Sequence, residues 1–316
     1  AAEPRHEPLL DRWGETIADI SYSSGTTGDP KGILLSHRAL AWAGVLVSEL
    51  AFVGRTSFDQ AGEPLGADDT LVSAFQAGSA ATANGFLNVG LAVGARMHFL
   101  SKFDPGTFTQ VMQDVQAILF YGGPAHLALW RQAEPDATPV ARAYVVIGQT
   151  LSRTDASWFV ERRGSAHLVN AYGLTESCAG MLVAVDEENI RDTGVIGRPV
   201  GPLDLRLVGP DGEEVDTEGE LVMSCFGMME GYLDRPDLTA EKLRDGWFRT
   251  GDIVERKGDV YYIRGRVGDR INRGGYKFDP IEVEEVATTV TGVTGAVACA
   301  IPHPVLGEDV ALAIEV

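Results

Sequence analysis

Short apolar runs alternate with helix-like segments along the first 190 residues. Five runs bounded by glycine or charged residues predict strands, at residues 69–75, 95–100, 117–122, 143–148 and 166–173. Residues 104–115 predict a helix with Asp104 as its N-cap and Pro105 at its first position. Its apolar side chains share one face: Phe108, Val111, Met112 and Val115. Strands that alternate with helices predict a largely parallel sheet covered on both faces.

The pattern changes after about residue 190. Residues 203–225 alternate apolar and polar positions around a Pro-Asp-Gly turn, which is typical of antiparallel strands. Residues 280–316 then predict a helix beginning at Pro280, a strand, a proline-containing turn and a last strand. The prediction is an α/β fold: parallel sheet layers covered by helices, a small antiparallel β-subdomain, and part of a small α+β domain. Because the chain stops within the last predicted strand, we expect it to be truncated.

Composition and charge narrow the choice of ligands. Lys and Arg total 26 against 45 Asp and Glu, a net charge of −19, which disfavours nucleic acid and anionic membrane surfaces as partners. The longest apolar stretch, residues 39–53, is too short to span a bilayer. The cysteines, Cys178, Cys225 and Cys299, lack metal-site spacing and predict buried thiols in a reducing compartment, the cytoplasm.

A loop rich in small residues, Tyr-Ser-Ser-Gly-Thr-Thr-Gly-Asp-Pro-Lys-Gly at residues 22–32, is the first candidate for chemistry. Its hydroxyls can donate hydrogen bonds, its glycines let backbone N–H groups converge on an anion, and Lys31 adds a cation. A solvated turn is the alternative interpretation. It is not a Walker A loop, because Pro30 precedes the lysine and Gly32 follows it.

The loop resembles the phosphate loop of the adenylate-forming superfamily, which includes acyl-CoA synthetases, luciferases and the adenylation domains of nonribosomal peptide synthetases. Four further segments resemble motifs of that superfamily and follow in its order, at residues 170–177, 219–239, 246–252 and 263–285. The chain is most similar to an acyl-CoA synthetase. The resemblance implies that residues 1–189 form the ATP- and acyl-binding region of a large domain whose beginning is missing. Residues 190–263 would be its β-subdomain, and residues 264–316 the hinge and the start of a mobile C-terminal domain.

The resemblance implies ATP-dependent activation of a carboxylic acid. An acyl-adenylate would form with release of pyrophosphate, and the acyl group would pass to CoA as a thioester. The alternatives are transfer to a carrier-protein thiol and a non-catalytic nucleotide or acyl-adenylate binding protein. ATP, Mg²⁺ and CoA are the implied cofactors, a small carboxylic acid is the implied partner, and a homodimer is a further possibility.

The resemblance also implies roles for individual residues. The β- and γ-phosphates would be held by the loop residues Ser23, Ser24, Gly25, Thr26, Thr27, Gly28 and Lys31. Adenine would be bound near Gly148, Asn170, Ala171, Tyr172 and Gly173. Asp252 would accept the ribose hydroxyls, with Arg266 nearby and Lys277 approaching the phosphate. The implied catalytic residues are Lys31, Thr175 at the α-phosphate, and Glu176 as the Mg²⁺ ligand.

The chain departs from the family pattern near the acyl site. Gln76 stands where many relatives have a histidine, and Ile147 adds a branched side chain where they usually have glycine. No aspartate is present there to pair with an α-ammonium group, so an amino-acid substrate is disfavoured. The expected acyl pocket is lined by Gln76, Ala77, Ser79, Gly122, Gly123 and Ile147; close helix packing is the alternative explanation of its small residues. Gly268 occupies the hinge position and tolerates the rotation a hinge needs.

Overall fold

Five parallel strands form the centre of the fold. A computed structural model describes residues 16–23, 30–50, 65–133, 139, 141–162, 166–178, 180–185, 189–293 and 295–316. The five parallel strands are β3 (Thr70–Ser73), β4 (Arg96–Phe99), β5 (Leu119–Gly122), β6 (Ala143–Ile147) and β7 (His167–Gly173). They are ordered β4-β3-β5-β6-β7, and every neighbouring pair is parallel. All five strands predicted from the sequence are confirmed.

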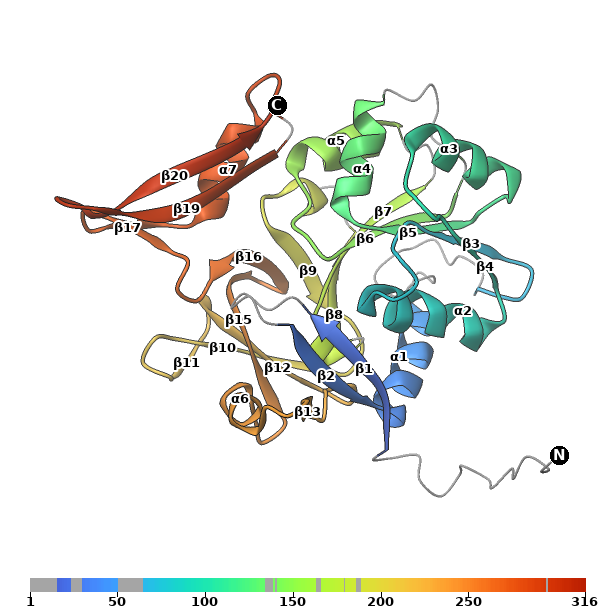
Figure 1. The fold of residues 1–316 in the computed structure, drawn as a ribbon, viewed down its shortest axis with the longest axis horizontal. Helices are drawn as coiled ribbons and strands as arrows, with labels where there is room; N and C mark the ends of the chain where they lie inside the picture. Colours follow the sequence, from blue (N-terminus) through green and yellow to red (C-terminus); the bar gives the residue numbers. More distant parts are fainter. Residues whose placement is uncertain are drawn as a thin grey trace.

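Helices cover both faces of this parallel sheet (Figure 1). One face carries α3 (Pro105–Asp114), α4 (Pro124–Gln132) and α5 (Arg153–Arg162); the other carries α1 (His37–Leu50), the π-helix η2 (Ala81–Leu87) and α2 (Asn88–Val93). The N-cap of α3 is as predicted, because Asp104 Oδ1 accepts a 2.8 Å hydrogen bond from the Thr107 N–H. Beneath α3 to α5, Phe108, Trp130 and Phe159 are at most 1% exposed, and burial of such aromatic side chains contributes several kcal/mol.

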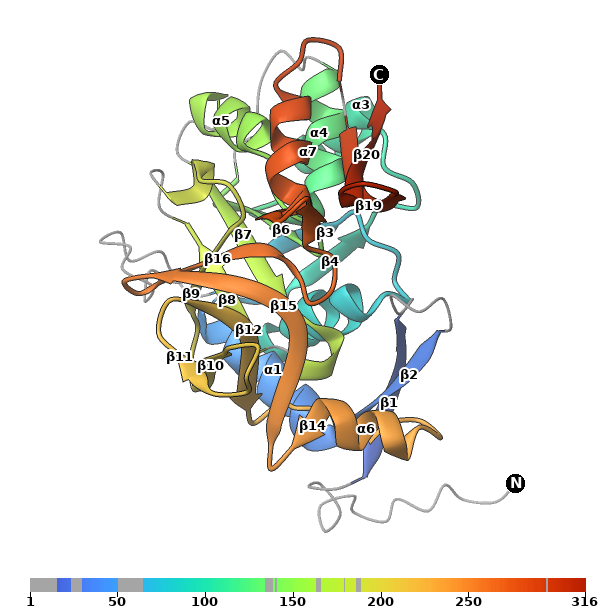
Figure 2. The same cartoon turned by 90° about the vertical axis from the view of Figure 1, so that its left-hand side faces the viewer.

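The predicted β-subdomain continues the same sheet. Antiparallel strands extend it from β7 in the order β8, β9, β16, β15, β12, β10 and β11, with β14 pairing β15, so that 13 strands form one sheet. Their bounds are β8 (Met181–Ala184), β9 (Val195–Pro199), β10 (Leu203–Val208), β11 (Glu214–Val215), β12 (Glu218–Cys225), β14 (Leu243–Arg244), β15 (Trp247–Lys257) and β16 (Val260–Arg266). Figure 2 shows β15 as a long curved strand between α6 (Pro236–Lys242) and the C-terminal elements.

A separate three-stranded sheet holds the two flanks of the predicted phosphate loop. The strands β1 (Ile17–Ser23) and β2 (Lys31–Ser36) form an antiparallel hairpin in which Ser23 pairs with Lys31, and β13 (Gly231–Tyr232) adds to β2. Two short 3₁₀ helices, η3 (Thr175–Ser177) and η4 (Asn189–Arg191), follow β7 and β8. The hairpin therefore places both ends of the loop beside each other.

The C-terminal elements form a third sheet beside one helix. The strands β17 (Ile271–Arg273), β18 (Tyr276–Phe278), β19 (Gly295–His303) and β20 (Gly307–Glu315) are ordered β18-β17-β20-β19, and α7 (Pro280–Thr288) packs on β19. The helix begins at Pro280 as predicted. Gly268 lies between β16 and β17, where the large sheet gives way to this small one. Within the described residues, no helix is both long and apolar enough to cross a membrane.

Candidate active site

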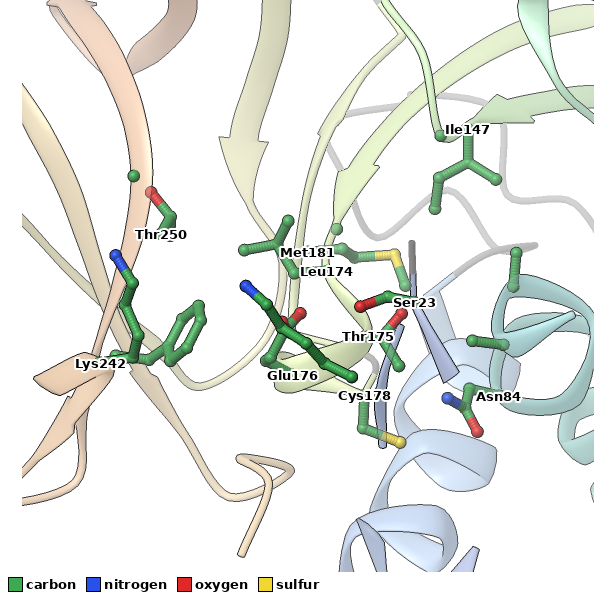
Figure 3. Close-up of a pocket in the computed structure, with 18 of the residues that line it drawn as sticks. Ser23, Asn84, Ile147, Leu174, Thr175, Glu176, Cys178, Met181, Lys242 and Thr250 are labelled. Atoms are coloured by element: carbon green, nitrogen blue, oxygen red, sulfur yellow. The ribbon is translucent and has the colours of Figure 1, made fainter. Parts of the chain in front are cut away.

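One cavity of about 660 Å³ brings together residues from most of the chain. Ser23 and Lys31 come from the hairpin, Thr175 and Glu176 from η3, and Arg266 from the end of β16. Figure 3 shows Thr175 and Glu176 between Lys242 and Thr250 on one side and Asn84 on the other. The motifs that are distant in sequence therefore meet at a single site.

The turn that carries Thr175 and Glu176 is held by its own backbone and by Ser177. The Ser177 hydroxyl lies 3.1 Å from the Leu174 carbonyl oxygen and 2.8 Å from that of Gly180, and Ser177 is fully buried. The Met229 N–H donates a 2.8 Å hydrogen bond to the Glu176 carbonyl. Because the backbone of the turn is held from two sides, its Thr and Glu side chains are left free to face the cavity.

Glu176 is oriented by Tyr232. The Tyr232 hydroxyl donates a 2.8 Å hydrogen bond to Glu176 Oε1, and burial together with the neighbouring carboxylate raises the pKa of Tyr232. Lys31 Nζ lies 5.8 Å from the centroid of the Tyr232 ring. Tyr232 therefore contacts both the Lys31 ammonium group and the Glu176 carboxylate. Lys31 and Glu176 both line the cavity.

The carboxylate at the cavity suits a Mg²⁺ ion that is bound by the protein on one side and by phosphate oxygens on the other. Within the described residues, no group of three or more His, Cys, Asp or Glu side chains is placed to hold a metal. Mg²⁺ commonly takes one or two protein carboxylates and completes its shell with water and substrate phosphates. Glu176, whose carboxylate keeps an oxygen that Tyr232 does not engage, fits that arrangement.

A hydrogen-bonded trio around the buried Asp252 carboxylate lies at the edge of the cavity. The Tyr172 hydroxyl donates a 2.5 Å hydrogen bond to Asp252 Oδ2, and Arg266 Nε donates one of 2.9 Å to Oδ1. Burial raises the pKa of Asp252, and the hydrogen bonds from Tyr172 and Arg266 act in the opposite direction. Burial and the Asp252 carboxylate raise the pKa of Tyr172 well above its ordinary value, so this phenol remains a donor.

A second set of polar residues in the cavity escaped the sequence reasoning. Arg249 forms an ion pair with the buried Glu220, whose Oε1 also accepts a 3.2 Å hydrogen bond from the Gly251 N–H. Lys242 at the end of α6 lines the same side, with its side chain 31% exposed. Arg249 and Thr250 lie within residues 246–252 and Lys242 lies shortly before them, so the resemblance of that segment to a superfamily motif was the one signal for them. Tyr232 likewise lies within residues 219–239, another segment with such a resemblance.

The part of the cavity formed by η2, β5 and β6 carries no charged residue. Its lining residues are Ala80, Ala81, Asn84, Gly85, Tyr121, Ile147 and Gly148. Cationic residues line the cavity elsewhere: Lys31, Lys242, Arg249 and Arg266. The chain as a whole has a net charge of −19, yet one side of the cavity carries cationic side chains and the other side carries no charge.

The predicted residues divide into three groups. The cavity is lined by Ser23, Lys31, Ile147, Gly148, Gly173, Thr175, Glu176 and Arg266. Ser24, Gly25, Thr26, Thr27 and Gly28 lie outside the described residues. The others do not line it: Gln76, Ala77, Ser79, Gly122, Gly123, Asn170, Ala171, Tyr172, Asp252 and Gly268. The side chain of Lys277 lies outside the described part of the structure.

Several of the predicted residues outside the cavity lining have specific surroundings or a defined place in the fold. The side-chain amide of Asn170 donates a 2.8 Å hydrogen bond to the Val195 carbonyl instead of facing the cavity. Gln76 and Ala77 are exposed, and Lys277 lies on β18 in the small sheet. Gly268 has a φ of +95°, a left-handed conformation that glycine adopts without strain, and a side chain there would meet no atom within 4 Å.

The cysteines differ from expectation at one position. Cys178 and Cys225 are half-buried free thiols beside the cavity, whereas Cys299 is exposed on β19. The prediction of a buried thiol is therefore wrong for Cys299, because it lies on a face of β19 where Val297 and Ile301 are exposed as well.

Known proteins resemble this chain in both sequence and fold. The AMP-binding enzyme family matches residues 2–233. Feruloyl-CoA synthase from an Amycolatopsis species is 33% identical over 93% of this chain and 58% of its own length, and indoleacetate–CoA ligase from Aromatoleum aromaticum is 30% identical over 89% and 56%. The crystal structure of ATP-bound MatB from Rhodopseudomonas palustris superposes with a TM-score of 0.83 at 26% identity, over 96% of this chain and 59% of MatB. The chain thus spans less than three fifths of the length of these relatives. It belongs to the AMP-binding enzyme family.

Proposed function

We propose that this protein activates a carboxylic acid with ATP, forming an acyl-adenylate and pyrophosphate, and then transfers the acyl group to the thiol of CoA. The observation that carries the proposal is a single cavity with cationic groups and the Thr175–Glu176 turn beside an uncharged wall. A triphosphate and a small acyl group need these two environments side by side. Two CoA ligases among the relatives support the same reaction.

In this reaction a carboxylate oxygen attacks the α-phosphorus, and the bond to the bridging oxygen of the β-phosphate breaks. Both reactants are anions, so positioning and charge compensation supply most of the rate enhancement. Lys31 would neutralise the leaving pyrophosphate, and the Thr175 hydroxyl would donate to an α-phosphate oxygen. Asp252 would accept hydrogen bonds from the ribose hydroxyls. These hydrogen bonds would replace part of its contacts with Tyr172 and Arg266.

Mg²⁺ would be held by Glu176 together with phosphate oxygens, and it would supply charge stabilisation of the pentavalent phosphorus. Tyr232 would hold the Glu176 carboxylate in position for that contact. The thiol of CoA would then attack the acyl carbon and release AMP. We also propose the cytoplasm as the compartment, which the three free cysteines support.

The proposal is tested by carboxylate-dependent exchange of pyrophosphate into ATP in the full-length protein. Lys31→Ala and Glu176→Ala are each expected to lower the exchange rate by about 100-fold or more, the usual effect of removing a group that stabilises developing charge. Lys257→Ala is the control, because Lys257 pairs with Glu255 away from the cavity. Unchanged rates in both cavity variants would remove these residues from the mechanism.

The acceptor is decided by the second half-reaction. A preformed acyl-adenylate complex is mixed with CoA or with a phosphopantetheinylated carrier protein, and AMP release is followed. Faster release with CoA alone supports the proposal, whereas release only with the carrier protein selects the alternative ligase. ATP binding without exchange for any acid would identify a non-catalytic binding protein.

A further inference from the structure

We infer that the uncharged end of the cavity selects an acyl group bearing a neutral hydroxyl, which Asn84 binds directly. This inference rests on the proposed function, since it names the class of acid that the same site activates. Asn84 is the polar residue in the middle of η2, and Figure 3 shows it on the far side of Thr175 and Glu176 from Lys242.

Asn84 is buried but has no partner. The residue is 2% exposed, and neither its side-chain nitrogen nor its oxygen has a hydrogen-bond partner within the described part of the chain. The hydroxyls of Ser79 and Thr82, which precede it in the chain, lie 2.9 Å apart and pair with each other. An unpaired buried amide is costly, and such exceptions in a folded protein call for an explanation. A ligand in the cavity that Asn84 lines would supply both missing bonds.

Tyr121 offers a second polar group at the same place. Its hydroxyl oxygen lies 2.3 Å from the position that a Cβ on Gly85 would occupy, so only glycine allows the phenol to approach η2 next to Asn84. Tyr121 lines the cavity together with Asn84 and Gly85. Burial raises the pKa of Tyr121, so the phenol stays protonated. Asn84 and Tyr121 together present two donor groups, the amide nitrogen and the phenol, and two acceptor oxygens.

The surroundings exclude a charged substituent. The residues that η2, β5 and β6 contribute to the cavity include no Lys, Arg, His, Asp or Glu. A carboxylate or ammonium at this end would be desolvated without a counter-ion, which costs far more than burying a neutral group. A hydroxyl can donate a hydrogen bond to the side-chain oxygen of Asn84 and accept one from its side-chain nitrogen, so it matches this amide. An acyl group that ends in hydrocarbon would leave the Asn84 amide unpaired.

The test compares matched acyl-adenylate mimics that differ by one hydroxyl. Acyl-sulfamoyl adenosines of cinnamate and 4-hydroxycinnamate, and of octanoate and 8-hydroxyoctanoate, are titrated into the full-length protein by calorimetry. We expect the wild type to bind the hydroxylated member of at least one pair about tenfold or more tightly. The cinnamate pair tests a phenolic hydroxyl and the octanoate pair tests an aliphatic hydroxyl, so the two pairs distinguish which kind of hydroxyl the cavity binds.

Variants assign the preference to its residues. Asn84→Leu keeps the size of the side chain and removes its polar atoms, so the affinity ratio is expected to fall to about one or to invert. Tyr121→Phe should lower the ratio without abolishing it. Asn88→Leu is the matched control, because the Asn88 side-chain nitrogen is also buried and unpaired but the residue does not line the cavity. We expect it to leave the ratio at the wild-type value.

Three outcomes are distinguishable. A ratio above about tenfold that Asn84→Leu removes and Asn88→Leu retains supports the inference. Equal binding of both members of each pair in the wild type, or a ratio unchanged in Asn84→Leu, overturns it and leaves the proposed function intact. Failure of ATP and all four mimics to bind overturns the proposed function and the inference with it.

Discussion

The hydroxyl of Tyr172 donates a 2.5 Å hydrogen bond to Asp252 Oδ2, joining β7 to β15 across 80 positions of sequence. Arg266 Nε holds the other oxygen at 2.9 Å. Asp252 is 4% exposed, so water has little access to its carboxylate. The two hydrogen bonds take the place of that hydration and fix the orientation of the carboxylate. The orientation of Asp252 beside the cavity therefore depends on a residue from another motif.

Tyr172→Phe removes this donor while keeping the ring. We expect the free energy of unfolding to fall by about 1–3 kcal/mol, because Oδ2 loses its partner in a buried site. ATP affinity should also fall, since the carboxylate is less well oriented. Urea unfolding and ATP titration measure the two effects. Tyr261→Phe is the control, because Tyr261 lies on β16 and does not line the cavity. Equal behaviour of the two variants would contradict the role of Tyr172.

Tyr232→Phe tests the orientation of Glu176. Without the 2.8 Å hydrogen bond to Oε1, we expect the Mg²⁺ concentration that gives half-maximal pyrophosphate exchange to rise several-fold. The KM for the acid should change little, because the acyl end of the cavity is untouched. Tyr262→Phe, which removes a 3.3 Å contact with Asp192, serves as control. Superimposable Mg²⁺ titrations of wild type and Tyr232→Phe would show that Tyr232 does not position the metal ligand.

The three cysteines are expected to react at different rates. Burial raises the pKa of Cys178 to about 12 and that of Cys225 to about 11, so both remain thiols from pH 7 to pH 9. Cys299 is exposed. Iodoacetamide should therefore label one cysteine rapidly in the folded protein at pH 8 and all three in urea, as counted by mass spectrometry. Cys299→Ser should abolish the rapid phase, and rapid labelling of a second thiol would contradict the burial of the other two.

His126 is expected to make stability depend on pH. Its Nδ1 accepts a 2.9 Å hydrogen bond from the Gly123 N–H at the start of α4, and burial lowers the pKa of His126. The folded state thus binds a proton less readily than the unfolded state, whose histidine titrates near about 6.5. The stability from neutral His126 is fully present above that pH and is lost as the pH falls through the folded-state pKa.

His126→Asn keeps an acceptor for the Gly123 N–H and removes the titration. We expect the variant to lose less unfolding free energy than the wild type between pH 7.5 and pH 5, measured by urea unfolding. His303→Asn, at the end of β19, is the control and should keep the wild-type dependence. An identical loss in His126→Asn and wild type would rule out His126 as the source.

The parallel strands, α3 with its Asp104 cap and the start of α7 at Pro280 were all predictable from the sequence. Each depends on apolar periodicity, a capping residue or proline within a few positions, and these act locally. The ordered motifs likewise identified Lys31, Thr175, Glu176 and Arg266, which the fold brings to one cavity. The antiparallel strands predicted within residues 203–225 form as β10, β11 and β12, but the sequence did not reveal that β8 and β9 connect this region to the parallel strands in one sheet.

Other features were decided only by the tertiary structure. The hydrogen bond from Tyr232 to Glu176 spans 56 positions, and no local pattern marks it. Asn170, expected at adenine, instead donates to the Val195 carbonyl, because a buried amide takes the nearest strand acceptor. Asn84 became a candidate only when its burial and its missing partners were known together. Sequence patterns therefore determine which elements form, whereas the pairing or isolation of each polar side chain depends on which elements pack against it.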